Sequence, residues 1–356
     1  MLPAVWDAMR PYLTESHGNP ASAHQVGRRA RQALESARER TAALLDADPD
    51  EVIFTSGATE ANNLAIFGLA GEPPGRIACS YIEHPCVIEP IRELERRGFT
   101  VDWLPVDATG YVRVESLQSD VRLVCLMLAN HETGAIQQVA DCKVPAAIHC
   151  DAAQAVGKIN VRFHELGVTT LTLSAHKLHG PQGVGALLVR RGTKLRPLFL
   201  GGHQQRGRRP GTEPVALAVG LATALELAER ERETRWAKVT ELRSRLLTYL
   251  RDHVSPVVLN GPENGGLPHT LNLSFPGCQS DTLLMNLDLA GVACSTGSAC
   301  SSGSLLPSPV LKAMRVPPEV LHSAMRFSFS ALLSEAEIDE AGRRIAAVVS
   351  RLRPPK

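Results

Sequence analysis

Short apolar runs that predict β-strands alternate with helical segments through the first half of the 356-residue chain, and this alternation constrains the fold most. It indicates an α/β domain with a largely parallel sheet, whose ligands gather at the carboxyl ends of the strands. Polar residues follow several of these runs, so the sequence predicts a site at that edge of the sheet. The predicted strands are 51–55, 76–80, 101–104, 121–128, 146–150, 168–173 and 184–189.

The strand predicted at 168–173 ends in Ser174, His176 and Lys177, before a Gly-Pro pair predicts a turn. A lysine held among apolar neighbours has a destabilised ammonium form, so more of it is the free amine that condenses with an aldehyde. Lys177 is therefore a candidate Schiff-base lysine for pyridoxal phosphate. The alternative is an ordinary loop lysine that points into water.

Asp151 follows the strand predicted at 146–150, and Gln154 lies three residues later. Pyridoxal phosphate acts as an electron sink when its ring nitrogen stays protonated, and a carboxylate at a strand end can hold that proton. Gln154 could donate a hydrogen bond to the phenolic oxygen of the ring. The alternative role of Asp151 is to cap a helix N-terminus.

Two segments could bind phosphate. The strand at 51–55 is followed by Ser56 to Thr59 and then a helical pattern, so free backbone N–H groups and the Thr59 hydroxyl form a natural phosphate cradle. A basic, glycine-rich loop at 201–212 precedes another helix. That loop could bind phosphate or lie flexibly on the surface.

His84 follows the strand at 76–80 and precedes Pro85, which starts a predicted helix. Its ring could stack on a cofactor and transfer protons. The alternative is a histidine that only caps the helix.

The pattern changes beyond residue 236, which indicates a second domain. Strands at 257–260 and 269–275, a helix at 281–289 and a strand at 325–330 are predicted there. Between them, the segment 294–304 is too polar and small in its side chains for core, which indicates a mobile loop. Cys300 on this loop is accessible, as a nucleophilic thiolate must be.

Composition excludes several classes of protein. Lys plus Arg total 38 against 37 Asp plus Glu, which argues against a partner that is nucleic acid or an anionic membrane. No apolar stretch reaches membrane-spanning length. The eight cysteines are scattered without a Cys-x-x-Cys pair, so we expect reduced thiols, no metal site and a cytoplasmic location.

Taken together, the motifs resemble those of the cysteine desulfurases of the NifS-like group, which are class V aminotransferases and fold-type I pyridoxal phosphate enzymes. The resemblance extends over the whole chain. It implies a large domain (13–235) with a mostly parallel seven-stranded sheet and a small α+β domain (236–356, with 1–12). Its motifs are Phe54-Thr-Ser-Gly-Ala-Thr-Glu60, Glu83-His84, Asp151-Ala-Ala-Gln154, Ser174-Ala-His-Lys177, Arg209-Pro-Gly-Thr212, Gly297-Ser-Ala-Cys-Ser-Ser302 and Arg326-Phe-Ser328.

The resemblance implies a homodimer that converts L-cysteine to L-alanine and passes the sulfur to a protein acceptor, such as an iron–sulfur scaffold, or into thiolation. Lys177 would carry the cofactor and move protons, and Cys300 would take the sulfur as a persulfide. The other implied roles are Asp151 for the ring nitrogen, Gln154 and His131 for the phenolic oxygen, His84 for ring stacking, Ala58, Thr59, Ser174, His176 and the other subunit's Thr212 for the phosphate, and Arg326 with Asn130 for the substrate.

Three features depart from the family pattern. The chain starts inside the helix that follows an Ala-Thr-Thr-Pro segment in the family, His131 replaces a common Asn, and segment 137–147 is short and contains Pro145. Two alternatives stay open at this point: a selenocysteine lyase, which turnover of selenocysteine against cysteine would identify, and a non-catalytic sulfur-assembly subunit with the same fold.

Overall fold

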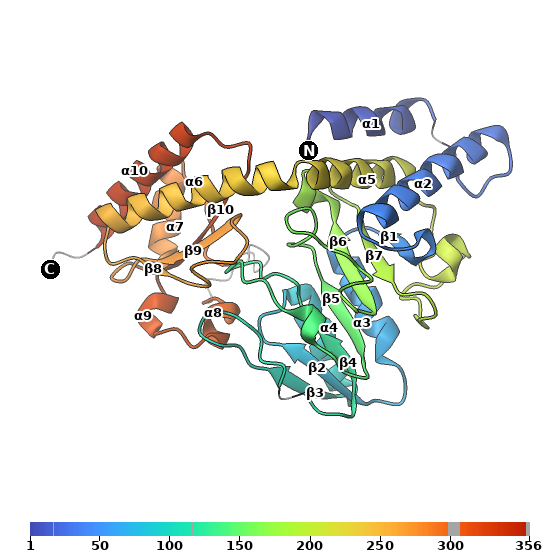
Figure 1. Cartoon of the computed structure of the whole chain (residues 1–356), viewed down its shortest axis with the longest axis horizontal. Helices are drawn as coiled ribbons and strands as arrows, with labels where there is room; N and C mark the ends of the chain where they lie inside the picture. The colour runs from blue at the N-terminus through green and yellow to red at the C-terminus, as the bar shows by residue number, and fades with distance from the viewer. Residues whose placement is uncertain (17, 116, 298–306, 354–356) are drawn as a thin grey trace.

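Seven strands form the larger of two sheets in the computed structural model, which describes residues 1–16, 18–115, 117–297 and 307–353 (Figure 1). The strand order is β1-β7-β6-β5-β4-β2-β3, and β7 is antiparallel to both neighbours while the other pairs are parallel. The mostly parallel α/β sheet expected from the sequence is confirmed. The strands are β1 (Val52–Thr55), β2 (Arg76–Ser80), β3 (Thr100–Leu104), β4 (Val121–Cys125), β5 (Ala147–Asp151), β6 (Thr170–Ser174) and β7 (Gly185–Val189).

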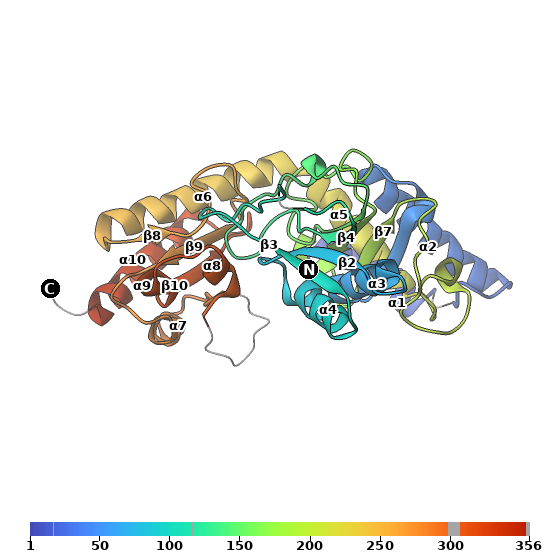
Figure 2. The same ribbon diagram turned by 90° about the horizontal axis from the view of Figure 1, so that it is seen from below.

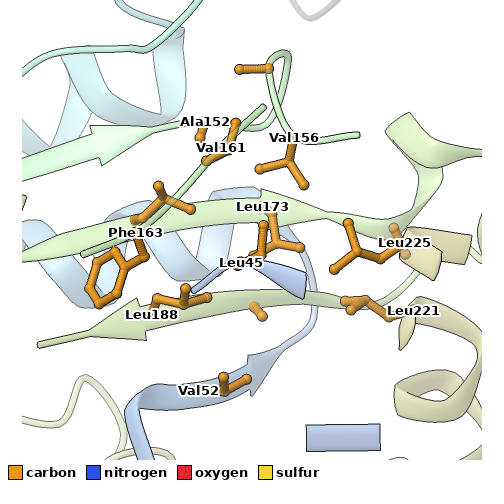
Figure 3. Close-up of a cluster of buried hydrophobic side chains, with 14 of the residues drawn as sticks. Leu45, Val52, Ala152, Val156, Val161, Phe163, Leu173, Leu188, Leu221 and Leu225 are labelled. Carbon is orange, nitrogen blue, oxygen red and sulfur yellow. The ribbon is translucent and has the colours of Figure 1, made fainter. Parts of the chain in front are cut away.

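Helices cover both faces of this sheet. On one face α2 (Gln25–Leu44) and α5 (Val215–Arg230) pack together, with α1 (Pro3–Thr14) against α5. On the other face lie α3 (Ala58–Ala70) and α4 (Pro85–Arg96). Because a central strand of such a sheet is covered twice, all five residues of β6 are buried. Leu173 of β6 packs among apolar side chains from both α5 and neighbouring strands (Figure 3).

Two predicted segments differ from the structure. The strand predicted at 121–128 ends at Cys125, although the Leu126 and Leu128 N–H groups still donate to the β5 carbonyls of His149 and Asp151. The Leu128 carbonyl accepts from the Gln137 N–H instead of from a strand of the sheet. The short segment 137–147 contains only the 3-10 turn η2 (Val139–Asp141) before β5.

The smaller sheet is antiparallel, with the order β10-β9-β8. Its strands pack with α6 and α10 around a second apolar core (Figure 2). Its elements are β8 (Val258–Leu259), β9 (Thr270–Ser274), β10 (Ala324–Ser328), α6 (Arg232–His253), α7 (Ser280–Leu289), α8 (Pro309–Ala313), α9 (Pro318–Leu321) and α10 (Glu335–Leu352).

A pair of consecutive helices joins the two cores. Only Glu231 separates α5 from α6, and the two helices run end to end from the larger sheet to the smaller one (Figure 1). The predicted division into a large domain (13–235) and a small domain (236–356 with 1–12) stays a prediction. Within residues 1–12, Val5 and Met9 of α1 pack in the core of the larger sheet. In the part of the chain that the structure describes, no helix combines the length and apolar character needed to cross a membrane.

Candidate active site

The carboxyl ends of β1, β2, β5 and β6 open onto a cavity of about 410 Å³. Parallel strands end at the same edge of a sheet, and this brings together side chains that are far apart in the sequence. Arg326 of the smaller sheet also reaches the cavity. The expected site residues that line it are Ala58, Thr59, His84, His131, Asp151, Gln154, Ser174, His176, Lys177 and Arg326.

Lys177 lies on the short turn η3 (Ala175–Leu178) that directly follows β6. His179 adopts a left-handed conformation with φ of 59°, which ends the turn and returns the chain toward β7. The Lys177 side chain is exposed toward the cavity. The expectation that apolar neighbours desolvate this amine is therefore wrong, although the predicted position at the strand end is correct.

Asp151 is held by two hydrogen bonds that orient its carboxylate. Asn62 of α3 donates to Oδ2 at 2.7 Å, and the Ala153 backbone N–H donates to Oδ1 at 2.9 Å. The second bond fixes the turn that follows β5, but no helix begins between β5 and β6, so the alternative of a helix cap is wrong. The carboxylate is 7% exposed and lines the cavity.

Behind Asp151, a buried relay fixes the orientation of Asn62. His149 Nε2 lies 3.0 Å from Asn62 Oδ1, and His149 Nδ1 lies 2.9 Å from the Thr170 hydroxyl. Burial lowers the pKa of His149 to about 3, so the ring is neutral. Because the Asn62 amide donates to Asp151, its oxygen must accept from His149 Nε2–H, and Nδ1 must accept from Thr170. The sequence analysis missed Asn62 and His149, which carry no signal beyond that of a helix and a strand interior.

The turn between β1 and α3, where the sequence predicts a phosphate cradle, lines the cavity. Gly57, the residue before α3, has no side chain to cap the first N–H groups of the helix. A Cβ on Gly185 of β7 would lie 2.8 Å from the Gly57 Cα atom, so only glycine lets the turn approach the sheet this closely. Ser174 and His176 lie nearby, with Ser174 Oγ and His176 Nδ1 2.9 Å apart.

Arg209 attaches the glycine-rich loop to this cradle. Its guanidinium donates to both carboxylate oxygens of Glu60, at 2.7 and 3.1 Å. Burial opposes ionisation of Glu60, but the hydrogen bonds from Arg209 and Ser56 outweigh it and hold the pKa of Glu60 below its usual value. Thr212, three residues along the loop, is exposed and does not line the cavity of its own chain.

His84 both caps α4 and faces the cavity. Its Nδ1 accepts the Cys86 backbone N–H at 3.2 Å, and the Cys86 thiol lies 2.9 Å from the same nitrogen. Burial lowers the pKa of His84, and the charges of Lys177 and Arg326 lower it further, against an opposing effect of Asp151. The ring is therefore neutral at pH 7, and its Nδ1 atom accepts the hydrogen bond that caps α4.

His131 packs edge-on against His84, with ring centroids 5.2 Å apart. Burial first, and then the charges of His84, Arg326 and Lys177, lower the pKa of His131 well below its usual value. Its Nδ1 atom is buried without a hydrogen-bond partner among the described residues. Since a buried polar nitrogen without a partner is unfavourable, this atom indicates a ligand in the cavity.

Arg326 links the two sheets at the cavity. It lies on β10 and donates from Nη1 to the His131 backbone carbonyl at 3.1 Å. Asn130, expected to contact substrate, does not line the cavity. Its amide instead donates to the Ile82 carbonyl at 3.0 Å, and its oxygen accepts from the N–H groups of residues 132 and 133.

Cys300 lies outside the described residues. The seven cysteines within the described residues are all free thiols. Of these seven, Cys294 lies nearest to Cys300 in the sequence. Burial, followed by the charge of Asp288, raises the pKa of Cys294 to about 11. This thiol is therefore a poor nucleophile at neutral pH.

The residues fit the cofactor that the sequence predicts. The cavity holds a fixed carboxylate, an exposed lysine amine and an uncapped helix N-terminus with a hydroxyl and an imidazole beside it. The partnerless His131 nitrogen supplies a further polar contact. Pyridoxal phosphate needs these groups for its ring nitrogen, its aldehyde and its phosphate.

Comparisons with known proteins show which family the chain belongs to. The sequence model of the family described as aminotransferase class-V matches residues 1–340. A cysteine desulfurase IscS of Dictyoglomus turgidum is 42% identical over 98% of this chain and 92% of its own length. A solved NifS-like protein superposes with a TM-score of 0.93 at 35% identity, covering 99% of this chain and 97% of that one. A solved SspA in complex with cysteine gives a TM-score of 0.82 at 32% identity, covering 93% and 96%.

Proposed function

This chain belongs to the aminotransferase class-V family, as a pyridoxal phosphate-dependent enzyme of the cysteine desulfurase group, and on that premise we propose how its residues convert L-cysteine to L-alanine. The carbon–sulfur bond of the substrate breaks, its sulfur bonds to the Cys300 sulfur as a persulfide, and the carbon takes a proton. The observation that carries this assignment is the convergence of Lys177, Asp151 and Arg326 on one cavity.

Pyridoxal phosphate, when bound, withdraws negative charge from the substrate carbon into its ring. Lys177 would hold the cofactor covalently, and Asp151 would keep the ring nitrogen protonated. The fixed orientation of Asp151 supports this, because Asn62 and Ala153 leave the carboxylate little freedom. The proposed contacts to the other parts of the cofactor are Gln154 and His131 for the phenolic oxygen, and Ala58, Thr59, Ser174 and His176 for the phosphate.

His84 would lie against the cofactor ring, and its Nε2 would accept or return a proton. The lowered pKa of His84 keeps the ring neutral near pH 7, as a proton acceptor must be. Its Nδ1 is engaged by the start of α4, which fixes the ring plane. Lys177, which lines the same cavity, is the second group able to move protons there.

Arg326 binds the substrate carboxylate. A guanidinium offers two parallel N–H donors to a carboxylate, and one Arg326 nitrogen already donates to the His131 carbonyl at the cavity. Because Arg326 belongs to the smaller sheet, substrate binding draws on both cores. The structural neighbour with bound cysteine supports cysteine as the substrate.

The remaining assignments concern partners and location. We infer a homodimer, in which the exposed Thr212 contributes to the phosphate site of the other subunit. A protein sulfur acceptor, such as an iron–sulfur scaffold, takes the persulfide sulfur. The free thiols support a reducing compartment, the cytoplasm. We also propose the domain division near residue 235, where α6 enters the second core.

The test compares Cys300→Ala with Cys294→Ala as a matched control. Both variants are expected to keep the visible absorbance of bound cofactor, but only Cys300→Ala is expected to lose sulfide release from cysteine in the presence of a reductant. Alkylation after addition of cysteine, followed by peptide mapping, locates the extra sulfur. Extra sulfur on Cys294, or normal turnover by Cys300→Ala, contradicts the assignment.

A further inference from the structure

A second, smaller cavity of about 50 Å³ shares one lining residue, Lys177, with the cofactor cavity. Its walls come from the turn after β6, from α5 and α6, and from residues beside the smaller sheet. The proposed function gives this cavity no role. The lining residues are Leu2, Gly157, Lys158, Lys177, Leu178, His179, Ala228, Arg235, His269, Ser330, Ala331 and Leu332.

The groups that can carry charge in this cavity are all cationic. They are Lys158, His179, Arg235 and His269, with Lys177 a fifth only while its amine is not bound to the cofactor, and none of the described residues lining the cavity is acidic. Arg235 also binds Glu231 through Nε and Nη2, at 3.0 and 2.7 Å, in the groove next to the cavity.

Two polar groups in the cavity have unused hydrogen-bonding capacity. The Nδ1 atom of His269 is buried and has no partner among the described residues. Lys158 donates to Gln154 Oε1 at 3.0 Å, and an ammonium group has three donors. A bound ligand that accepts hydrogen bonds would satisfy both.

The cationic groups destabilise one another's charged forms. Burial lowers the pKa of Lys158 to about 7, and the charge of Lys177 adds to this effect. Burial also lowers the pKa of His269, to about 3, with further contributions from Lys158, His179 and Arg235. The pKa of His179 is also lowered, first by burial and then by the charge of Arg235. A negative charge in the cavity would offset both the burial and the repulsion.

We propose that this cavity binds one small monovalent anion of the halide or carboxylate type. The volume exceeds the roughly 10 to 15 Å³ that one water needs, yet it is too small for a drug-sized ligand. An access route exists, because a neighbouring groove shares Leu2, Arg235, Ala331 and Leu332 with the cavity. The proposal does not rest on the proposed function, but Lys177 couples the anion electrostatically to the cofactor cavity.

The test measures the thermal midpoint of the holoenzyme in sodium bromide, sodium formate and sodium gluconate at equal ionic strength. Bromide or formate is expected to raise the midpoint saturably, whereas gluconate is too large to enter. If protonated Lys158 is required, the half-saturating concentration rises about 30-fold between about pH 6 and about pH 8.5. The titratable groups that interact with Lys158 are Lys177, His176, His179 and His269. Arg235 lines the same cavity and binds Glu231.

Lys158→Met and Arg235→Met are each expected to abolish the difference between the salts, and the exposed Lys194→Met is the matched control that keeps it. If Lys158→Met does not fold, Arg235→Met alone shows whether the difference between the salts depends on this cavity. An anomalous bromide peak in the cavity supports a halide, and a response to formate alone supports a carboxylate. Equal midpoints in all three salts, or a bromide effect that survives in both cavity variants, overturns the proposal.

Discussion

Replacing Asn62 with leucine should reveal how strongly the buried relay holds Asp151. The change keeps the approximate volume of the side chain but removes the 2.7 Å bond to the Asp151 carboxylate and the 3.0 Å bond to His149. A hydrogen bond to a charged group contributes about 1.5 to 3 kcal/mol, and an unpaired buried donor costs about 1 to 3 kcal/mol. We therefore expect Asn62→Leu to lower the free energy of unfolding by about 3 to 5 kcal/mol.

The same variant should bind the cofactor less tightly, because the Asp151 carboxylate loses the bond that aims it into the cavity. A loss of about 1.4 kcal/mol in cofactor binding corresponds to a tenfold rise in the dissociation constant. Urea unfolding measures the first effect, and equilibrium dialysis with pyridoxal phosphate measures the second.

The matched control is Asn63→Leu, one residue along the same helix, where the half-buried side chain donates to the Thr59 carbonyl at 2.9 Å and to the Cys86 carbonyl at 3.4 Å but not to Asp151. This control is expected to change stability by less than about 1 kcal/mol. If Asn62→Leu loses no more stability than Asn63→Leu and binds the cofactor as tightly as the wild type, the relay does not position Asp151.

Three further outcomes are expected. Lys177→Ala should lose covalent attachment of the cofactor, and borohydride reduction with peptide mapping would refute this by finding the label on another lysine. His149, whose pKa is lowered to about 3, should make stability fall as the pH drops from about 6.5 toward 3, because the unfolded chain takes up the proton first; acid titration followed by circular dichroism should show a shallower fall in His149→Gln. Mixing Lys177→Ala chains with Thr212→Ala chains should restore some cofactor binding in mixed dimers, and no gain over the separate variants would rule out donation across subunits.

The strands along the chain, and the polar residues that line the cavity after them, could be predicted because each polar group follows an apolar run. The positions of Asp151 and Lys177 after β5 and β6 depend only on local pattern and on the rule that parallel strands end together. Their convergence in one cavity confirms that logic. The exposure of Lys177 could not be predicted, because it depends on how the turn after β6 faces the open cavity.

The missed or misplaced residues all depend on contacts between distant segments. Asn62 and His149 look like ordinary interior residues until α3 packs across β5. Asn130 and His131 are adjacent in sequence, yet the turn directs only the His131 ring to the cavity, while Asn130 bonds to the Ile82 carbonyl. No periodicity in the sequence distinguishes the two orientations.

The junction between α5 and α6 determines how the second core is oriented and how far it lies from the larger sheet. Since one non-helical residue separates the helices, a single inserted residue within α6 would turn everything downstream by about 100° and advance it by about 1.5 Å. Arg326 would then point away from the cavity. Seven inserted residues would nearly restore the direction but shift Arg326 by about 10 Å, so no change in helix length preserves both angle and distance. Insertions are therefore expected to be tolerated in surface loops and not within α5 or α6.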